Sequence, residues 1–157
     1  MSRLSRLDYC NSILYSIPQQ QDRLQRIMNK GARIPLNITL PNRLTRSNKN
    51  LTSQHWLPIK YRILFKIATI TYKTIFISQP SYLRNLITIN KNNKNLRPCS
   101  SITLVNQRTS TNIAKCDFRH SSPSVWNSLS HTIRNCTSLL SFKKNLKTYY
   151  FELAYPS

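Results

Sequence analysis

The segment from Leu57 to Ser78 is the longest apolar stretch of the sequence, and it constrains the fold more than any other feature. Nearly all of its positions are apolar. On a helix, with 100° per residue, one narrow stripe is formed by Arg62, Lys66, Thr69 and Lys73. This pattern predicts a central helix, begun near Pro58, that its neighbours surround on every side but one. A membrane span is not expected, because each interior lysine would cost about 2.5–3.5 kcal/mol there. The β-branched content leaves a strand open, but the length favours a helix.

Two other segments have the period of amphipathic helices and carry basic stripes beside their apolar faces. The first runs from about Gln20 to Arg33, with Leu24, Ile27, Met28 and Ile34 as its apolar arc and with a ridge of Arg23, Arg26, Lys30 and Arg33. The second covers residues 138–155, capped by Thr137 or Ser138, and its basic flank is Lys143, Lys144 and Lys147. We also expect shorter helices at residues 2–16, after Pro80, and after Ser121 or Ser122 with Pro123 in the first helical position.

These patterns predict a mainly α protein: a small helical assembly with a minor β element around residues 100–118, where Ile102 and Leu104 alternate with polar residues. Glycine is nearly absent, which argues against Gly-rich phosphate loops. The expected parts, which share one core, are a helical hairpin (1–34), a basic connector (35–54), the central apolar helix with a short helix (55–88), a loop with weak strands (89–120), and a Trp-containing short helix with the C-terminal amphipathic helix (121–157).

The charge balance limits the partners of this chain. The sequence has 24 Lys and Arg residues against 4 Asp and Glu residues, a formal net charge of +20. Domains of this size usually have a net charge of about 2–8 in magnitude, so we expect a polyanionic partner, RNA or DNA in the first place and an anionic membrane surface in the second. The candidate contacts are the ten basic residues of the three helices: Arg23, Arg26, Lys30, Arg33, Arg62, Lys66, Lys73, Lys143, Lys144 and Lys147.

Catalysis by this chain is not expected. The carboxylates Asp8, Asp22, Asp117 and Glu152 are scattered, whereas acid/base pairs and two-metal centres need clustered ones. The sequence lacks a P-loop, a nucleophile elbow and an HExxH motif, and we expect neither a cofactor nor a small-molecule substrate.

The four cysteines lack a CxxC motif, and no apolar signal segment follows Met1. We expect reduced thiols and an intracellular protein, cytoplasmic or nuclear. A zinc site from Cys116, His120, His131 and Cys136 has loose spacing, and unrelated buried thiols and exposed imidazoles explain these residues better.

Trp126, in the stretch SSPSVWNSL, could offer a surface for base stacking or fill a core. No Lys or Arg lies between Ser121 and Ser130, whereas stacking surfaces usually lie in basic grooves. We therefore expect Trp126 to be a core anchor whose indole N–H reaches a carbonyl, together with Leu129, Phe142 and Leu146. Trp56, in QHWLPIK between His55 and Lys60, is the better candidate for a surface aromatic; the alternative is that it only starts its helix.

Several stretches occur in an order that resembles the region after the polymerase domain in jockey-like non-LTR retrotransposon reverse transcriptases. They cover nearly the whole chain: SRLDYCNSILYSIP (5–18), RLQRIMNKGAR (23–33), HWLPIKYRILFKI (55–67), YKTIF and QPSYL (within 72–83), LRPCSS (96–101), SPSVWNSL (122–129) and SLLSFKKNLKTYYF (138–151). The resemblance implies a C-terminal portion of an RNA-directed DNA polymerase, beyond the catalytic palm, with the paired aspartates of the active site upstream. The implied role is to hold template RNA, primer or target DNA, and the implied partner is the upstream polymerase domain.

Departures from the family pattern leave other functions open. Gly31 replaces an alanine of the pattern, Ser130 replaces the proline after WNSL, and the connector after Arg33 has lost most of its pattern. A decayed retrotransposon copy without molecular function is one alternative. A basic module that binds a membrane surface or the ribosome is another.

Overall fold

A computed structural model describes residues 11–34, 51–90 and 102–156 of the chain, and these residues are mainly helical. The long elements are α2 (Pro18–Arg33), α4 (Ile59–Tyr72), α7 (Phe118–Ser128) and α9 (Leu139–Ala154). The short ones are η1 (Asn11–Leu14), the π-helical η2 (Lys73–Ile77), α5 (Ser81–Arg84), α6 (Asn112–Cys116) and α8 (His131–Arg134). The prediction of a mainly α fold is confirmed.

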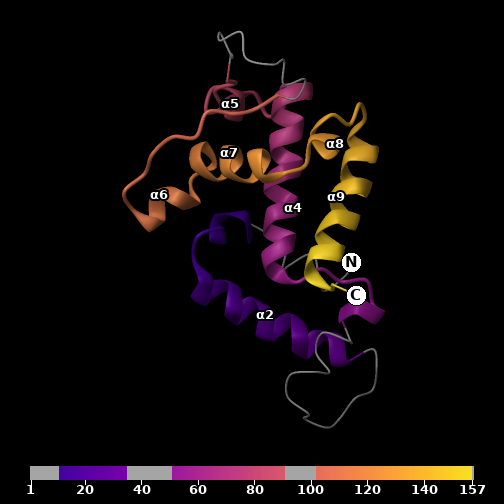
Figure 1. The fold of residues 1–157 in the computed structure, drawn as a ribbon. Coiled ribbons are helices and arrows are strands. Elements are labelled where there is room, and N and C mark those ends of the chain that lie inside the picture. Colours follow the sequence, from indigo (N-terminus) through magenta and orange to yellow (C-terminus); the bar gives the residue numbers. More distant parts are fainter. Residues whose placement is uncertain (1–10, 35–50, 91–101, 157) are drawn as a thin grey trace.

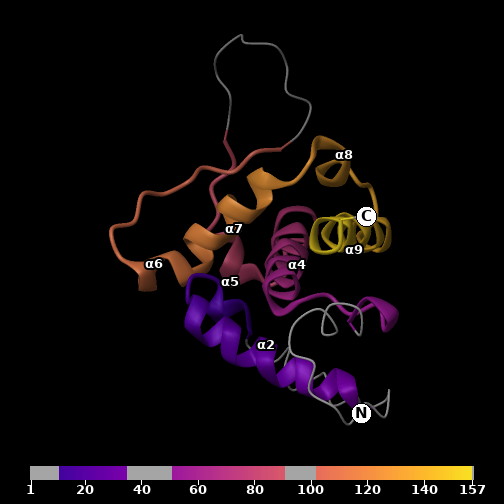
Figure 2. The same cartoon turned by 60° about the horizontal axis from the view of Figure 1, so that its bottom comes forward.

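Helix α4 is the centre of the assembly. In both views it lies beside α7 and α9, while α2 crosses near its N-terminal end (Figures 1 and 2). Ile59, Ile63 and Ile67 are each at most 1% exposed, and Ala68 is fully buried. η2 extends α4 by five residues. It ends at Ser78, whose backbone is in the left-handed conformation at φ 57°. The apolar segment of the sequence is therefore the central helix that its pattern predicts.

One hydrophobic core joins all the long helices. The buried side chains come from α2, α4, α7 and α9, with further members from the segments between them. Trp126, Phe142 and Leu146 are 0% exposed and Leu129 is 2% exposed, so all four predicted core anchors lie inside it. The Trp126 indole N–H donates to the Ile102 carbonyl at 2.9 Å, and its ring lies 5.9 Å from that of Phe142 on α9.

Helix α2 packs through a narrower face than its sequence pattern predicts. Met28 and Ala32 are buried, but Ile27 is 55% exposed and Ile34 is 62% exposed, so the predicted apolar arc is wrong at these two positions. The reason is that α2 packs mainly against α4 and the short turn η1, with one row of residues spaced four apart. Gln25 belongs to this contact, since its Oε1 accepts a hydrogen bond at 2.8 Å from the Ile59 N–H, which is otherwise an orphan donor at the start of α4.

Helix α7 begins earlier than the sequence indicates. Asp117 is its N-cap, Pro123 lies inside the helix, and Ser121 and Ser122 are buried rather than capping. The Ser122 hydroxyl lies 2.8 Å from that of Thr71, so two small polar side chains satisfy each other where α7 contacts α4. The cap of α9 is Ser138, one of the two predicted residues, whose Oγ accepts from the Ser141 N–H at 3.1 Å.

The minor β element expected around residues 100–118 amounts to one antiparallel bridge between Ile89 and Leu104 in the described residues, and residues 112–116 form α6. Asn127 occupies the other edge of the segment that contains Leu104. Its side-chain amide accepts from the Leu104 N–H at 3.0 Å and donates to the Leu104 carbonyl at 2.8 Å. One side chain thus takes the hydrogen bonds that a further strand would need.

Three expectations concern residues that lie partly or wholly outside the described ranges. Of the helix expected at 2–16, only the 3-10 turn Asn11–Leu14 is described, with Asn11 buried. Most of the connector 35–54 and the loop 91–101 lie outside the described residues. Residues 51–53 form a helical turn.

Candidate functional site

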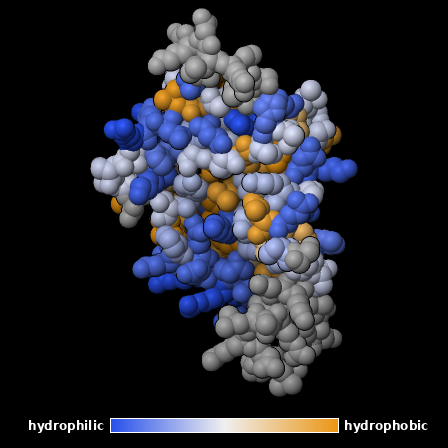
Figure 3. Space-filling view, viewed as in Figure 1, coloured by the Kyte–Doolittle hydropathy of each residue, from blue (hydrophilic) through white to orange (hydrophobic). Residues whose placement is uncertain are grey.

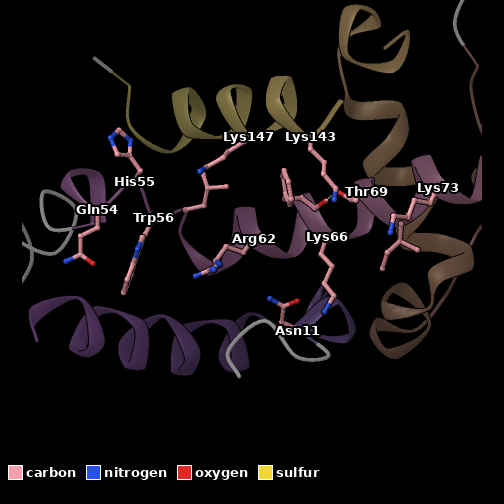
Figure 4. A pocket seen from close by; sticks show the side chains of 13 residues that line it. Asn11, Gln54, His55, Trp56, Arg62, Lys66, Thr69, Lys73, Lys143 and Lys147 are labelled. Carbon is pink, nitrogen blue, oxygen red and sulfur yellow. Dashed lines mark hydrogen bonds between the residues drawn. The ribbon is translucent and has the colours of Figure 1, made fainter. Parts of the chain in front are cut away.

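A groove of about 670 Å³ lies along one side of α4. α4 forms its floor, α9 one wall, and η1 together with the segment before α4 the remainder (Figure 4). The lining residues are Asn11, Gln54, His55, Trp56, Leu57, Arg62, Phe65, Lys66, Thr69, Ile70, Lys73, Lys143 and Lys147. Its volume is in the range typical of ligand-binding clefts.

Five of the ten predicted basic residues line this groove. Arg62, Lys66 and Lys73 come from the polar stripe of the central helix, and at 1.5 Å per residue the stripe extends over roughly 16 Å. Lys143 and Lys147 come from α9 and, being one turn apart, point toward α4 from the facing wall (Figure 4). Two stripes that are far apart in the sequence therefore line one groove.

Among the described residues, the lining of the groove carries no negative charge. None of its lining residues is Asp or Glu, and the three acidic residues of the described ranges, Asp22, Asp117 and Glu152, are all exposed elsewhere. Cations that line a cleft of low dielectric reinforce one another and raise the local concentration of anions. The arrangement can hold a chain of phosphates.

Trp56 lies at one end of the groove, and its backbone is held in a helix-ending motif. The His55 N–H donates to Thr52 O at 3.0 Å and the Trp56 N–H to Leu51 O at 2.9 Å. This is the hydrogen-bond pattern of a Schellman motif, with His55 in the left-handed conformation at φ 52°. The motif ends the turn at residues 51–53 and directs the half-buried Trp56 side chain toward the space between α4 and α2 (Figure 4).

Tyr155, just after α9, also holds the backbone of Trp56. Its hydroxyl donates to the Trp56 carbonyl at 2.9 Å. Burial raises the pKa of Tyr155 to about 12, so the phenol stays protonated and remains a donor throughout the neutral and mildly alkaline range.

The other five predicted basic residues do not line the groove. Arg23, Arg26 and Lys30 on α2 and Lys144 on α9 are exposed, and Arg33 is half-buried. Hydrophilic residues gather over α2 at the lower left of Figure 3 as a separate surface. α2 turns its Met28–Ala32 row toward α4, and its ridge therefore faces away from the cleft.

Sequence reasoning did not identify the neutral residues of the groove. Only one of them, Thr69, belongs to the predicted polar stripe. The others include Asn11, Gln54, His55, Phe65 and Ile70. No periodicity could reveal the contribution of residues 54–56, since they reach the groove through a chain reversal. The left-handed residue that makes this reversal is a histidine, not the glycine that would mark it in sequence.

The Cys and His residues weighed as a zinc site do not converge. Within the described ranges no group of three or more His, Cys, Asp or Glu side chains could hold a metal ion. His131 lies 3.1 Å from the Asn135 amide, and Cys136 contacts the Thr132 carbonyl and the Asn145 amide. Cys116 and Cys136 are free thiols.

Comparison with known proteins adds no relative: no family model, no curated protein and no solved structure matches this chain. Among residues 11–34, 51–90 and 102–156, no helix has the length and apolar character needed to cross a bilayer.

Proposed function

We propose that this chain is a non-catalytic, nucleic-acid-binding part of a retrotransposon RNA-directed DNA polymerase, which holds template RNA or target DNA through phosphate contacts. In this proposal the upstream polymerase domain of the parent polypeptide performs the synthesis. The ordered motifs from SRLDYC to FKKNLKTYYF support the origin, and the groove supports the role.

One observation carries the proposal: five cations from α4, η2 and α9 line a single groove, and none of its described lining residues is acidic. Isolated basic stripes are usually solvated helix faces, and such faces have no reason to meet. Here Lys143 and Lys147 extend from α9 toward α4, and Lys66 extends from α4 toward Asn11, so cations from both helices line one groove that a polyanion could follow (Figure 4). Contacts of this kind neutralise phosphates and release their counterions, and they provide affinity without base specificity.

The test is a binding titration at several salt concentrations. Fluorescence anisotropy with labelled RNA should show an affinity that falls on the order of a hundredfold between about 50 and 200 mM salt, as five phosphate contacts to a single strand predict. Vesicles of anionic lipid, added in competition, should not release the RNA. Absence of RNA and DNA binding at low salt would overturn the proposal, and release by vesicles would favour the membrane-surface alternative.

A further inference from the structure

The groove contains more than cations. Trp56, Leu57, Phe65 and Ile70 contribute apolar surface to the same lining as the lysines. Contact with phosphates alone needs no such surface, because a phosphate chain is charged along its whole length. An apolar and aromatic surface beside fixed cations matches a ligand that alternates flat hydrophobic groups with anionic ones.

The order of the groups along the groove is defined. From one end to the other, Figure 4 shows Trp56 first, then Arg62 with Lys147, then Lys66 with Lys143, and Lys73 last. The aromatic ring therefore lies at one end of a cationic track. A strand lying in the groove would place its phosphates along α4, near the cations of α4 and α9, and one base at the tryptophan.

Trp56 is also positioned before any ligand arrives. Its N–H is bound by Leu51 and its carbonyl by Tyr155, so the backbone on both sides of the side chain is fixed. A backbone that is already held leaves less conformational entropy to lose when a ligand binds.

We propose that the groove binds an unpaired segment of RNA or DNA, with one base stacked on Trp56 and the adjoining phosphates held by the α4 and α9 cations. This inference rests on the proposed function and narrows its ligand to single strands. A duplex keeps the faces of its bases inside the stack, so it can use the cations but not the tryptophan.

The experiment compares three labelled ligands of equal length: oligouridylate, oligothymidylate and a blunt DNA duplex. Both single strands should bind the full chain more tightly than the duplex. Trp56→Ala should weaken single-strand binding roughly 5- to 150-fold, the equivalent of one base–aromatic stack, without changing the salt slope. Trp56→Phe should recover part of the loss. The matched control is Tyr82→Ala, which removes an aromatic that is 69% exposed on α5 and absent from the groove.

A second measurement avoids dependence on the alanine variant. Oligouridylate should quench the tryptophan emission of the unsubstituted chain through Trp56, and the quenching should disappear in Trp56→Phe. Equal binding of duplex and single strands, with no change in Trp56→Ala and no quenching, would overturn the inference and leave the proposed function standing. Loss of all oligonucleotide binding in the unsubstituted chain would overturn both.

Discussion

The two tryptophans of this chain occupy opposite kinds of environment. Trp126 is fully buried, gives its N–H to Ile102 and packs among Tyr72, Phe76 and Phe142. Trp56 is half-buried and borders a cleft in the company of Arg62 and Lys147 (Figure 4). Trp126 lies wholly inside the core, whereas Trp56 packs partly against the core and also borders a groove lined by cations. The contrast separates the part of the molecule that maintains the fold from the part that we propose to bind.

The largest expected effect is on stability. Trp126→Ala should lower the free energy of unfolding by about 3–5 kcal/mol, since it leaves a large cavity in the core and frees the Ile102 carbonyl. Trp56→Ala should lower it by less, about 1–2 kcal/mol, because its side chain is only partly buried and borders an open groove. Urea titration followed by circular dichroism measures both. Equal losses would remove the contrast between the two regions.

A smaller effect is expected next to Trp126. Asn127→Ala should cost about 1–3 kcal/mol, because the Leu104 N–H and carbonyl both lose their side-chain partner. Hydrogen exchange at the Leu104 amide should accelerate, while RNA affinity should not change.

The neighbouring exposed residue supplies the control for that substitution. Ser128→Ala should change stability by no more than about 0.5 kcal/mol. If Asn127→Ala weakened RNA binding as much as a groove substitution does, the division between a packing region and a binding region would be wrong.

The smallest effect is a pH dependence at Tyr155, beside Trp56. Burial raises its folded-state pKa from 10.0 to about 12, so the folded chain holds the phenolic proton more tightly than the unfolded chain does. The contribution to stability is therefore complete below pH 10 and is lost as the pH rises from 10 toward 12. Unfolding measured over this range should show a steeper decline for the unsubstituted chain than for Tyr155→Phe; parallel curves would contradict the assignment.

Much of the fold could be predicted from periodicity, because burial in this chain is decided helix by helix. The central helix, the core position of Trp126 and a cap at Ser138 all follow from local pattern. The start of α7 could not be predicted in this way. Asp117 caps the helix, whereas the two serines expected to cap it are buried, and Ser122 contacts Thr71 of α4. The exposure of Ile27 depends on how α2 meets α4, which is a tertiary property.

The candidate site was predictable only in part, because it also depends on how the helices pack. Each stripe of cations is visible in the sequence, but which stripes face each other depends on packing. The α4 and α9 stripes meet, whereas the α2 ridge does not join them. Trp56 stands out as an aromatic beside a basic helix, but its place in the groove depends on the left-handed turn at His55, which no residue type marks.

The most direct test of the central claim is the salt dependence of single-strand binding in two double variants of equal charge. Lys143→Gln with Lys147→Gln removes two groove cations, and Lys30→Gln with Lys144→Gln removes two exposed ones outside it. If the groove holds the phosphates, the first pair lowers the slope of log affinity against log salt by about 1.4 and the second leaves it unchanged. Equal changes in both variants would show that binding depends on overall charge and that the groove is not the site.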